Sequence, residues 1–322
     1  MKQKRQWLAV RKDLLPTQAR WLTLLSFLLP LLIWSLVSYA PFVWHPKIKV
    51  TEPASVTWFQ AGMLIDKQLF FDEVNKAVAQ GNPVPEGLRA NPVYLPAPDE
   101  VAVAFYTAFV TEPKRRSEQW LHQSLWHSIT IIFWGFLLSS LIGIPIGILC
   151  GTFAAFSKLQ EPFVEFFRYL PAPAFGALAV AILGIHDGPK IAIIFLGTFF
   201  QQVLIISNTT RKLDTSLIEA ALTLGANKMQ VLFRVVIPGI SPDLVRDLRV
   251  LLGWAWTYLI VAELIGTSSG ITFFITQQAR YNNFDNVFAA IMMIGIIGLV
   301  TDIILGKLSK RIFPWEQSQN KA

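Results

Sequence analysis

Long apolar segments constrain what this chain can fold into more than any other feature. Several stretches are long enough to cross the hydrocarbon core of a bilayer as helices, which takes about 20 residues. They lie at about 21–44, 125–153, 168–185, 190–208, 250–266 and 286–306. Only 15% of the residues are charged, against about 25% in soluble domains. The sequence therefore predicts an all-α polytopic membrane protein with about six transmembrane helices.

The net charge of +7 is distributed as the positive-inside rule expects for a membrane protein. Residues 45–120 hold 8 basic and 9 acidic side chains, so this region is predicted to lie outside the cell. The basic excess comes from the two ends of the chain and from the loop over 209–249. An even number of spans places residues 1–20 and the tail 309–322 together, and both are predicted to be cytoplasmic. The same distribution argues against a nucleic-acid partner.

The first apolar segment is predicted to be a retained transmembrane helix over 21–44. A cleaved signal peptide is the alternative, but the apolar core of such a peptide usually has only ~7–15 residues. No A-x-A cleavage site follows the segment. The basic lead over 1–20 is then expected to lie on the anionic headgroups of the lipid bilayer.

Residues 45–120 form the first long polar region. The stretch Ala54–Ala79 has the pattern of an amphipathic helix, and 99–110 has the pattern of a second one. Gly and Pro residues at 81–87 separate the two. Two roles remain open for this region, contact with an external binding protein and a cap without a specific partner.

Small and rigid residues predict local details of the spans. In the second span, glycines recur at four-residue spacing and predict a bare helix face for close approach of another helix. These glycines are Gly143, Gly147 and Gly151. Pro171 and Pro173 predict an irregular entry to the third span, and 186–189 is predicted to form a tight outer turn.

A polar segment separates the fourth and fifth predicted spans. Residues 219–238 read EAALTLGANKMQVLFRVVIP. Ser216 and Glu219 have the spacing of a capping box at a helix start. Gly225 is expected either to end that helix in a left-handed turn or to allow close approach of another backbone. A second short helix, over about 228–236, is expected to stop at Pro238. The sequence predicts a small helix–turn–helix that stands out of the membrane.

This segment resembles the signature of the permease subunits of ABC importers, which reads EAA, three residues, G, nine residues, I-x-L-P. The residues that match by type and spacing are Glu219, Ala220, Ala221, Gly225 and Pro238. Val235 and Ile237 replace the usual Ile and Leu. The resemblance implies a cytoplasmic coupling helix, with Ser216 at its start, within a coupling loop over 209–245. This helix is expected to dock in a groove on a separate ATPase and to transmit its closure.

Further motifs resemble the nitrate, sulfonate, taurine and bicarbonate permeases within that class. They are Leu95-Pro96-Ala97-Pro98, the stretch from Trp254-Ala255-Trp256 to Glu263, and SSGITFFI at 268–275. The resemblance covers about 95–308 and implies a permease transmembrane core over 121–308. The preceding part, about 45–94, is longer than the resemblance leads us to expect.

The resemblance also implies partners. An importer of this kind combines two permease copies, ABC ATPase subunits and an extracytoplasmic solute-binding protein in the bacterial inner membrane. Because the motif occurs once, one chain is expected to supply one half, and a homodimer is the simplest assembly. ATP and Mg would bind to the ATPase, so no cofactor is expected in this chain. The solute would be a small anion such as nitrate, a sulfonate, taurine or bicarbonate.

Polar and aromatic residues inside the spans are candidates for the translocation path. They are Glu263, Trp254, Trp256, Gln201 and Gln202. A carboxylate within a membrane span is costly, and it therefore indicates a functional role by default. The alternative for Glu263 is a place at the outer rim, bonded to the Gly-rich turn at 266–270. The two Gln amides can equally hydrogen-bond a neighbouring helix.

The sequence lacks the motifs of common enzymes. It contains no G-x-x-x-x-G-K-[ST] phosphate loop, no H-E-x-x-H and no G-x-S-x-G. The four His and the single Cys150 are scattered, so no metal site is indicated. We expect no catalytic activity in the isolated chain. The alternatives to an ABC importer are an ion-gradient-driven secondary transporter that uses Glu263 and a non-transporting membrane anchor or receptor that binds an extracellular partner through 45–120.

Overall fold

The computed structural model divides the chain into two compact units. The first contains residues 1–107 and 279–289, and the second contains residues 108–278 and 290–322. The structure describes residues 14–40, 47–90, 95–113, 119–265 and 269–315. Most of the predicted basic lead, turn residues 266–268 and the end of the predicted tail lie outside the described residues.

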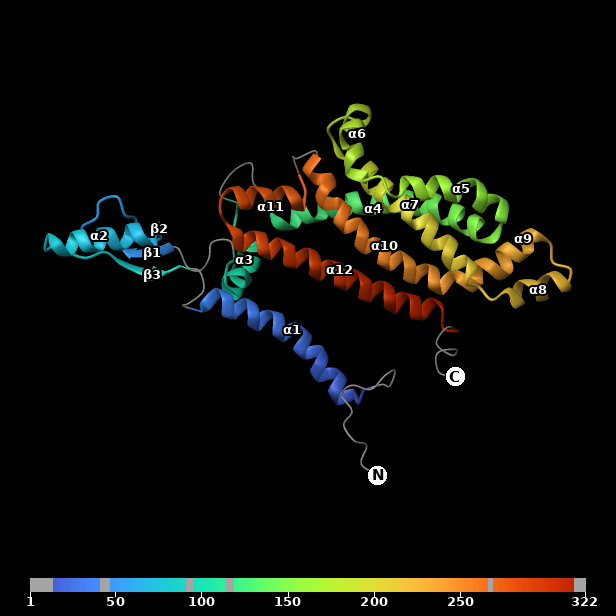
Figure 1. Ribbon diagram of the computed structural model, residues 1–322, viewed down its shortest axis with the longest axis horizontal. Coiled ribbons are helices and arrows are strands. Elements are labelled where there is room, and N and C mark those ends of the chain that lie inside the picture. Colours follow the sequence, from blue (N-terminus) through green and yellow to red (C-terminus); the bar gives the residue numbers. More distant parts are fainter. Residues whose placement is uncertain (1–13, 41–46, 91–94, 114–118, 266–268, 316–322) are drawn as a thin grey trace, which may run out of the picture. The chain divides into compact units, whose positions relative to one another are not determined.

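In the first unit, helix α1 spans Pro16–Tyr39 and is apolar and exposed along most of its length (Figure 1). Its Trp34 stacks on Phe288, with ring centroids 5.8 Å apart. The indole Nε1 of Trp34 also donates a hydrogen bond to the carbonyl oxygen of Pro96, at 2.9 Å. Helix α3, which spans Pro98–Val110, packs against the same cluster. One face of α1 is therefore held by protein, and its other faces are apolar as lipid contact requires.

A small antiparallel sheet forms the rest of this unit. Its strand order is β2-β1-β3, and helix α2 follows β2 directly. The elements are β1 (Lys47–Glu52), β2 (Leu64–Asp66), α2 (Lys67–Ala79) and β3 (Glu86–Arg89). Alternate residues Ile48 and Val50 of β1 are buried with Phe70 of α2. The sheet thus buries one face in its own small core.

The predicted helix over 54–79 is wrong in its first half. Only α2, from Lys67, is helical, because the chain before it turns back to pair β2 with β1. Gly62 supports this turn with a φ of +87°, a conformation that favours glycine. An amphipathic pattern indicates which side chains are buried, but not whether they lie on a helix or a strand. Here some of the buried side chains lie on a strand.

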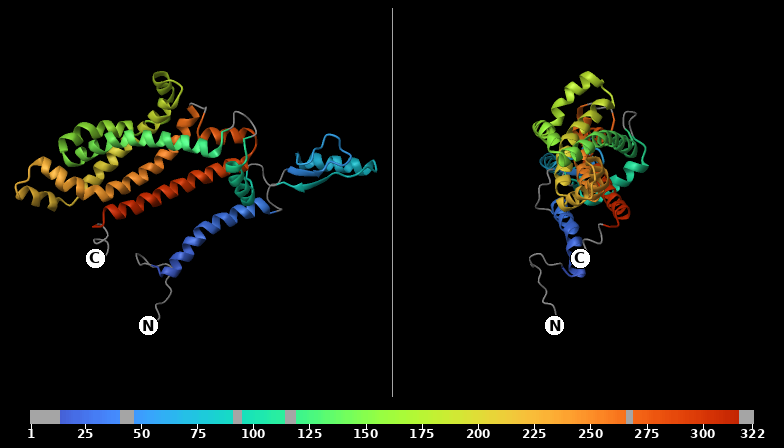
Figure 2. Two further views of the ribbon diagram at one scale, coloured as in Figure 1. Left: turned by 180° about the vertical axis from the view of Figure 1, so that it is seen from behind. Right: turned by 90° about the vertical axis from the view of Figure 1, so that its right-hand side faces the viewer.

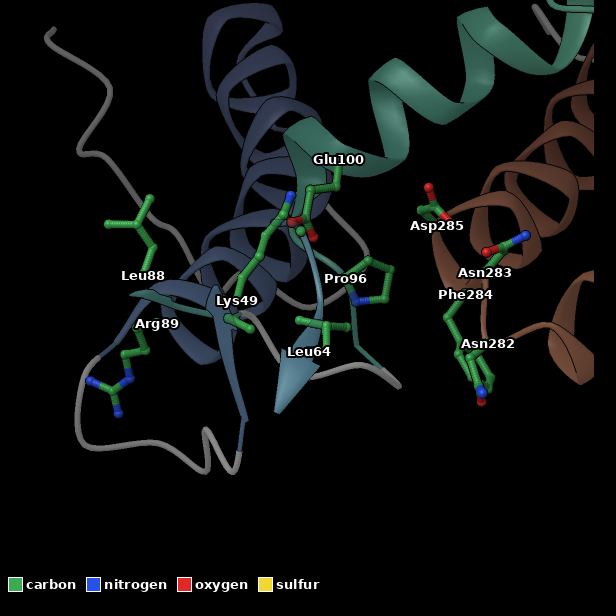
Figure 3. A pocket seen from close by; sticks show the side chains of 12 residues that line it. Lys49, Leu64, Leu88, Arg89, Pro96, Glu100, Asn282, Asn283, Phe284 and Asp285 are labelled. Carbon is green, nitrogen blue, oxygen red and sulfur yellow. The ribbon is translucent and has the colours of Figure 1, made fainter. Parts of the chain in front are cut away.

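The other face of the sheet borders a hollow of about 520 Å³ (Figure 3). Lys49 lies there between its cross-strand neighbours Leu64 and Leu88. The charged residues that line the hollow are Lys49, Arg89, Glu100 and Asp285. Because these are two basic and two acidic groups, the hollow indicates no preference for a ligand of either charge.

In the second unit, α4 (Leu121–Thr152) and α7 (Asp187–Arg211) run side by side (Figures 1 and 2). A Cβ added at Gly147 would lie 2.8 Å from the Cβ of Ile206, and one at Gly151 would collide with Thr210. The predicted close approach is confirmed at these two glycines. Gly143 is less tightly packed, because its Cβ would meet Gln202 at an ordinary 3.4 Å.

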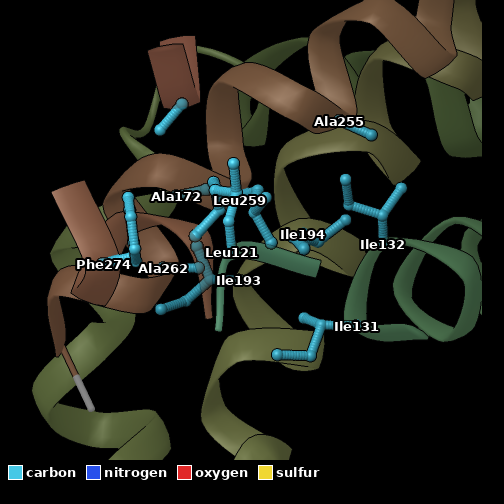
Figure 4. Close-up of a cluster of buried hydrophobic side chains, with 12 residues drawn as sticks. Leu121, Ile131, Ile132, Ala172, Ile193, Ile194, Ala255, Leu259, Ala262 and Phe274 are labelled. Carbon is cyan, nitrogen blue, oxygen red and sulfur yellow. The ribbon is translucent and has the colours of Figure 1, made fainter. Parts of the chain in front are cut away.

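The helices that follow α7 in the chain are α8 (Thr215–Thr223), α9 (Lys228–Val231), the π-helical turn η2 (Leu232–Val236), α10 (Ile237–Ile265), α11 (Ile271–Arg280) and α12 (Phe284–Ile312), of which α11 and α12 extend into both units. Helices α10, α11 and α12 contribute to the core drawn in Figure 4. The core contains Leu121 of α4, Ile193 of α7 and Leu259 of α10, all fully buried. The long helices α4, α7 and α10 therefore pack against one another in one core.

The third predicted span is not one straight helix. The chain forms α5 (Ala154–Phe167), the 3-10 turn η1 (Ala172–Phe175) and α6 (Gly176–Leu183), and the pair bends by 82°. The break between α5 and α6 lies at Pro171 and Pro173, so the predicted irregular entry is confirmed there. The described residues contain five helices that could cross a membrane, or up to six if this bent pair is one span. The predicted turn over 186–189 is wrong, because α7 already begins at Asp187.

Candidate functional site

Helix α8 begins with a different cap from the predicted one. The Asp214 side chain accepts a hydrogen bond from the backbone N–H of Ser216, at 2.9 Å, and this bond lowers the pKa of Asp214. The predicted capping box of Ser216 and Glu219 is therefore wrong. A carboxylate is a strong N-cap because it also complements the positive end of the helix dipole. Since its folded pKa is lowered, the cap is complete above the ordinary aspartate pKa of about 3.9 and is lost as the pH falls through the lowered value.

Gly225 ends α8 in the predicted left-handed turn. Its φ is +83°, and its N–H donates to the carbonyl of Leu222 at 2.9 Å. The N–H of Ala226 donates to the carbonyl of Ala221 at 3.0 Å. This pair of bonds is the Schellman arrangement, which satisfies the free carbonyls at a helix end. The prediction for Gly225 is confirmed.

The next helix does not stop at Pro238. Asn227 and Gln230 form a reciprocal capping box at the start of α9, with bonds of 2.9 and 2.8 Å. The chain then stays helical through η2 into α10, so that Lys228–Ile265 is one continuous helix of 38 residues, roughly 57 Å long, part of which is apolar enough to cross a membrane. Proline in a helix clashes with the carbonyl four residues before it. The wider π-helical turn just before Pro238 relieves that clash, which is why the predicted stop is wrong.

The segment 215–236 has an inner face and an outer face. On the inner face, Ile218 and Ala221 pack against a buried cluster formed by α9, η2 and the start of α10, to which the ends of α4 and α7 also contribute Ile148 and Ile206. On the outer face, apolar side chains are exposed: Leu217, Leu222, Leu224, Met229 and Phe233. Ser216, Glu219, Ala220, Gly225 and Pro238 are exposed as well. Large exposed apolar side chains gathered beside charged ones mark an interaction surface.

Glu263 lies near the C-terminal end of α10, far along the helix from segment 215–236, and is fully buried. One carboxylate oxygen accepts the backbone N–H of Thr272 at 2.8 Å, and the other accepts the Ser128 hydroxyl. The Ser128 oxygen in turn accepts the N–H of Ile271 at 2.8 Å. Glu263 and Ser128 thus satisfy the first two N–H groups of α11. The predicted alternative places Glu263 at the rim and bonded to the turn at 266–270; in the structure Glu263 is buried, and it bonds the start of α11 just after that turn.

Gly270 makes room for this carboxylate. Its φ is +105°, and a Cβ at this position would collide with the Glu263 carboxylate. We expect Gly270→Ala to destabilise the protein by roughly 2 kcal/mol or more, because it adds backbone strain and a clash. The measurement is the amount and the Tm of the purified chain. Gly253→Ala on α10 is the matched control, because its Cβ would meet nothing within 4 Å, and an equal loss in both variants would contradict the expectation.

A second polar network adjoins Glu263 and was missed by sequence reasoning. Lys190 is only 2% exposed, and its Nζ lies 3.1 Å from Asp187 and 3.3 Å from Ser269. The His127 Nε2 lies 3.0 Å from the same Asp187 oxygen and 2.9 Å from the Ser269 hydroxyl. Placing a charged lysine just inside an apolar span costs free energy. The position of Lys190 at the start of such a span could therefore have indicated this network from the sequence alone.

The other path candidates do not come together with Glu263. Gln202 is fully buried and bonds Ser139 at 2.6 Å and Ser140 at 2.9 Å, so it ties α7 to α4. Gln201 is half-buried, Trp256 packs on the core, and Trp254 is exposed. The geometry of Gln202 is that of a helix-packing residue.

Comparison with known proteins identifies the class. Residues 143–314 match the family described as binding-protein-dependent transport system inner membrane component. The chain belongs to this family, and it is the membrane-spanning permease subunit of an ABC importer. The ion-gradient-driven alternative finds no support among the similar proteins.

Among relatives, the chain is 35% identical over 190 residues to a probable ABC transporter permease of Brucella abortus, covering 59% of this chain and 76% of the relative. It is 32% identical over 225 residues to the taurine transport system permease TauC of Escherichia coli, covering 70% of this chain and 81% of TauC. The bicarbonate permease CmpB of Synechocystis is 27% identical over 181 residues, covering 56% of this chain and 65% of CmpB. The predicted resemblance to the nitrate, sulfonate, taurine and bicarbonate type is confirmed.

The fold is also that of solved importers. A structure titled as an inward-facing conformation of the MetNI methionine ABC transporter matches with a TM-score of 0.55 and 20% identity, over 62% of this chain and 99% of that chain. The predicted fold class is therefore confirmed, with the small sheet at residues 47–89 as an addition that the sequence did not predict.

Proposed function

We propose that this permease imports a small anionic or zwitterionic solute and that α8 and α9 dock on a separate ATPase. The observation that carries the docking assignment is the outer face of 215–236, which presents exposed apolar side chains and Glu219 from two capped helices. Relatives named for taurine, aliphatic sulfonates and bicarbonate support the solute class, because these solutes share a small oxyanion group.

The helical path from α9 to α10 supports a way to transmit ATPase closure. Helix α9, η2 and α10 form one continuous helical segment, so a displacement at Met229 is carried toward Glu263. Ile218 and Ala221 pack on a buried cluster to which α4 and α7 also contribute, so those helices would move with it. Such a change requires that the nucleotide-bound ATPase binds one state of the permease more tightly than the other.

The assembly that we propose is a homodimer in the bacterial inner membrane, with both termini in the cytoplasm. ATP and Mg would bind to the partner ATPase, and this chain would hold no cofactor and carry out no catalysis. An extracytoplasmic solute-binding protein would deliver the solute. The bilayer would cover the exposed apolar side chains of α1, among them Phe27 and Leu32.

Copurification tests this proposal directly. The tagged chain is solubilised gently from its native membrane, and the proteins that accompany it are identified. We expect an ABC ATPase to copurify, and we expect solute uptake into reconstituted vesicles to require ATP. Uptake that follows a proton or sodium gradient without ATP would overturn the proposal.

A further inference from the structure

One ion pair joins two membrane helices near the coupling end of the second unit. The Arg249 guanidinium on α10 donates through Nε to one Asp302 oxygen at 2.8 Å, and through an η nitrogen to the other oxygen at 2.7 Å. Asp302 lies on α12. A two-pronged bond between a guanidinium and a carboxylate is directional, and it is stronger than a single neutral hydrogen bond.

The part of α12 that carries Asp302 has little else to hold it. The last buried residue of α12 is Met293, and from Ile294 to Ile312 each described residue is at least partly exposed. Buried apolar side chains therefore anchor only the first third of the helix, and the side chains of the rest are partly or largely exposed. In that remaining part, the bond to Arg249 is a strong and specific link to α10.

The local geometry favours this link. Gly306 lies one turn after Asp302, and a Cβ at Gly306 would come within 3.1 Å of the Arg249 guanidinium. The glycine lets the guanidinium lie close against α12. Charged groups within a membrane span are costly unless they are paired, so each residue makes the other tolerable.

Arg249 also belongs to the helix that carries any displacement of 215–236. On α10 it lies two residues after Asp247, which accepts a hydrogen bond from Thr209 of α7. Arg249 and Asp247 therefore connect α10 to two different helices at nearly the same level. We infer that the Arg249–Asp302 pair is a coupling clamp that makes the C-terminal half of α12 follow α10. This inference rests on the proposed docking of α8 and α9, and both residues are positioning residues.

Spin-label distances in the permease–ATPase complex test the clamp without knowledge of the solute. The single cysteine is replaced (Cys150→Ser), and labels are placed at exposed positions outside the proposed docking face, Leu264→Cys on α10 and Leu308→Cys on α12. Labelled chain is diluted with unlabelled chain, so that the distance within one protomer is measured. With the clamp intact, we expect the distance to stay the same when ATP is added.

The variants Arg249→Gln and Asp302→Asn are expected to let the two labels separate or approach by several ångström when ATP is added. The exchanged variant, with Arg249→Asp and Asp302→Arg together, restores the opposite charges and is expected to recover the constant distance. Asp243→Asn is the control, because its bond to Arg246 lies within α10. A purely stabilising pair would lower the Tm in the single variants without making the distance depend on ATP.

Two results would overturn the clamp. One is a constant distance in both single variants, and the other is a distance that changes with ATP in the unsubstituted pair. If the single variants fail to fold, Arg249→Lys serves instead, because it keeps the charge but loses the two-pronged bond. A constant distance in that variant would equally overturn the inference. Copurification of the ATPase reports separately on the proposed docking, so the two failures are distinguishable.

Discussion

Reversing the charge of Glu219 is expected to abolish ATP-driven uptake and to remove the ATPase from the purified complex. Glu219 is exposed on α8, and within the described part of the chain its side chain forms no ion pair or hydrogen bond. Glu219→Lys therefore leaves the fold of the permease intact and acts at the docking surface. Breaking a charge pair buried in an interface costs about 2–5 kcal/mol, which corresponds to roughly a 30-fold or greater loss of affinity.

The control for this experiment is Glu165→Lys, which makes the same charge change at an exposed position on α5. We expect this variant to retain the ATPase and the uptake rate. The amount of each variant in the membrane is measured alongside, because a folding defect would lower both. Retention of the ATPase by Glu219→Lys at wild-type levels would show that α8 does not dock as proposed.

The second large effect is expected at Glu263. Replacing it with leucine removes the acceptor for the Thr272 N–H and for the Ser128 hydroxyl, and leaves both groups buried. Each buried polar group without a partner costs about 1–3 kcal/mol. We expect Glu263→Leu to lose most of the folded protein, measured as the monodisperse fraction and the Tm in detergent.

Glu263→Gln separates a structural role from a role of the charge itself. The amide keeps an acceptor oxygen for Thr272, and the Ser128 hydroxyl can accept from the new NH₂ group. We therefore expect the Gln variant to fold and to keep uptake within about threefold of the wild type, a change of less than 1 kcal/mol. A well-folded Gln variant without uptake would show that the carboxylate charge serves transport, as the translocation-path hypothesis holds.

The sequence alone predicted features that depend on local chemistry. The conformation of Gly225 follows from the steric freedom of a residue without a Cβ, and the bare face at Gly147 follows from helical spacing. The caps were harder to predict. Ser216 and Glu219 have the right spacing, but in the folded helix the Asp214 carboxylate accepts the Ser216 N–H that the Glu219 side chain would otherwise bind.

Pro238 and the stretch 54–79 show where local patterns mislead. A proline usually ends a helix, yet the π-helical turn before it lets α9 continue into α10. An amphipathic pattern between Ala54 and Ala79 predicts a helix, yet pairing with β1 takes its first half into a sheet. In both places the outcome depends on how neighbouring backbone is arranged, which side-chain periodicity does not record.

By itself, the sequence determined that this chain is a multi-span membrane protein and a member of a permease family, because the length of apolar segments and the spacing of a motif can both be read directly from the order of residues. Only the tertiary structure decided which polar residues are partners. Glu263 meets Ser128, and Arg249 meets Asp302, across separations of 135 and 53 residues. The physical reason is that a buried charge needs a partner, and helix packing alone determines which distant residue stands within hydrogen-bond distance.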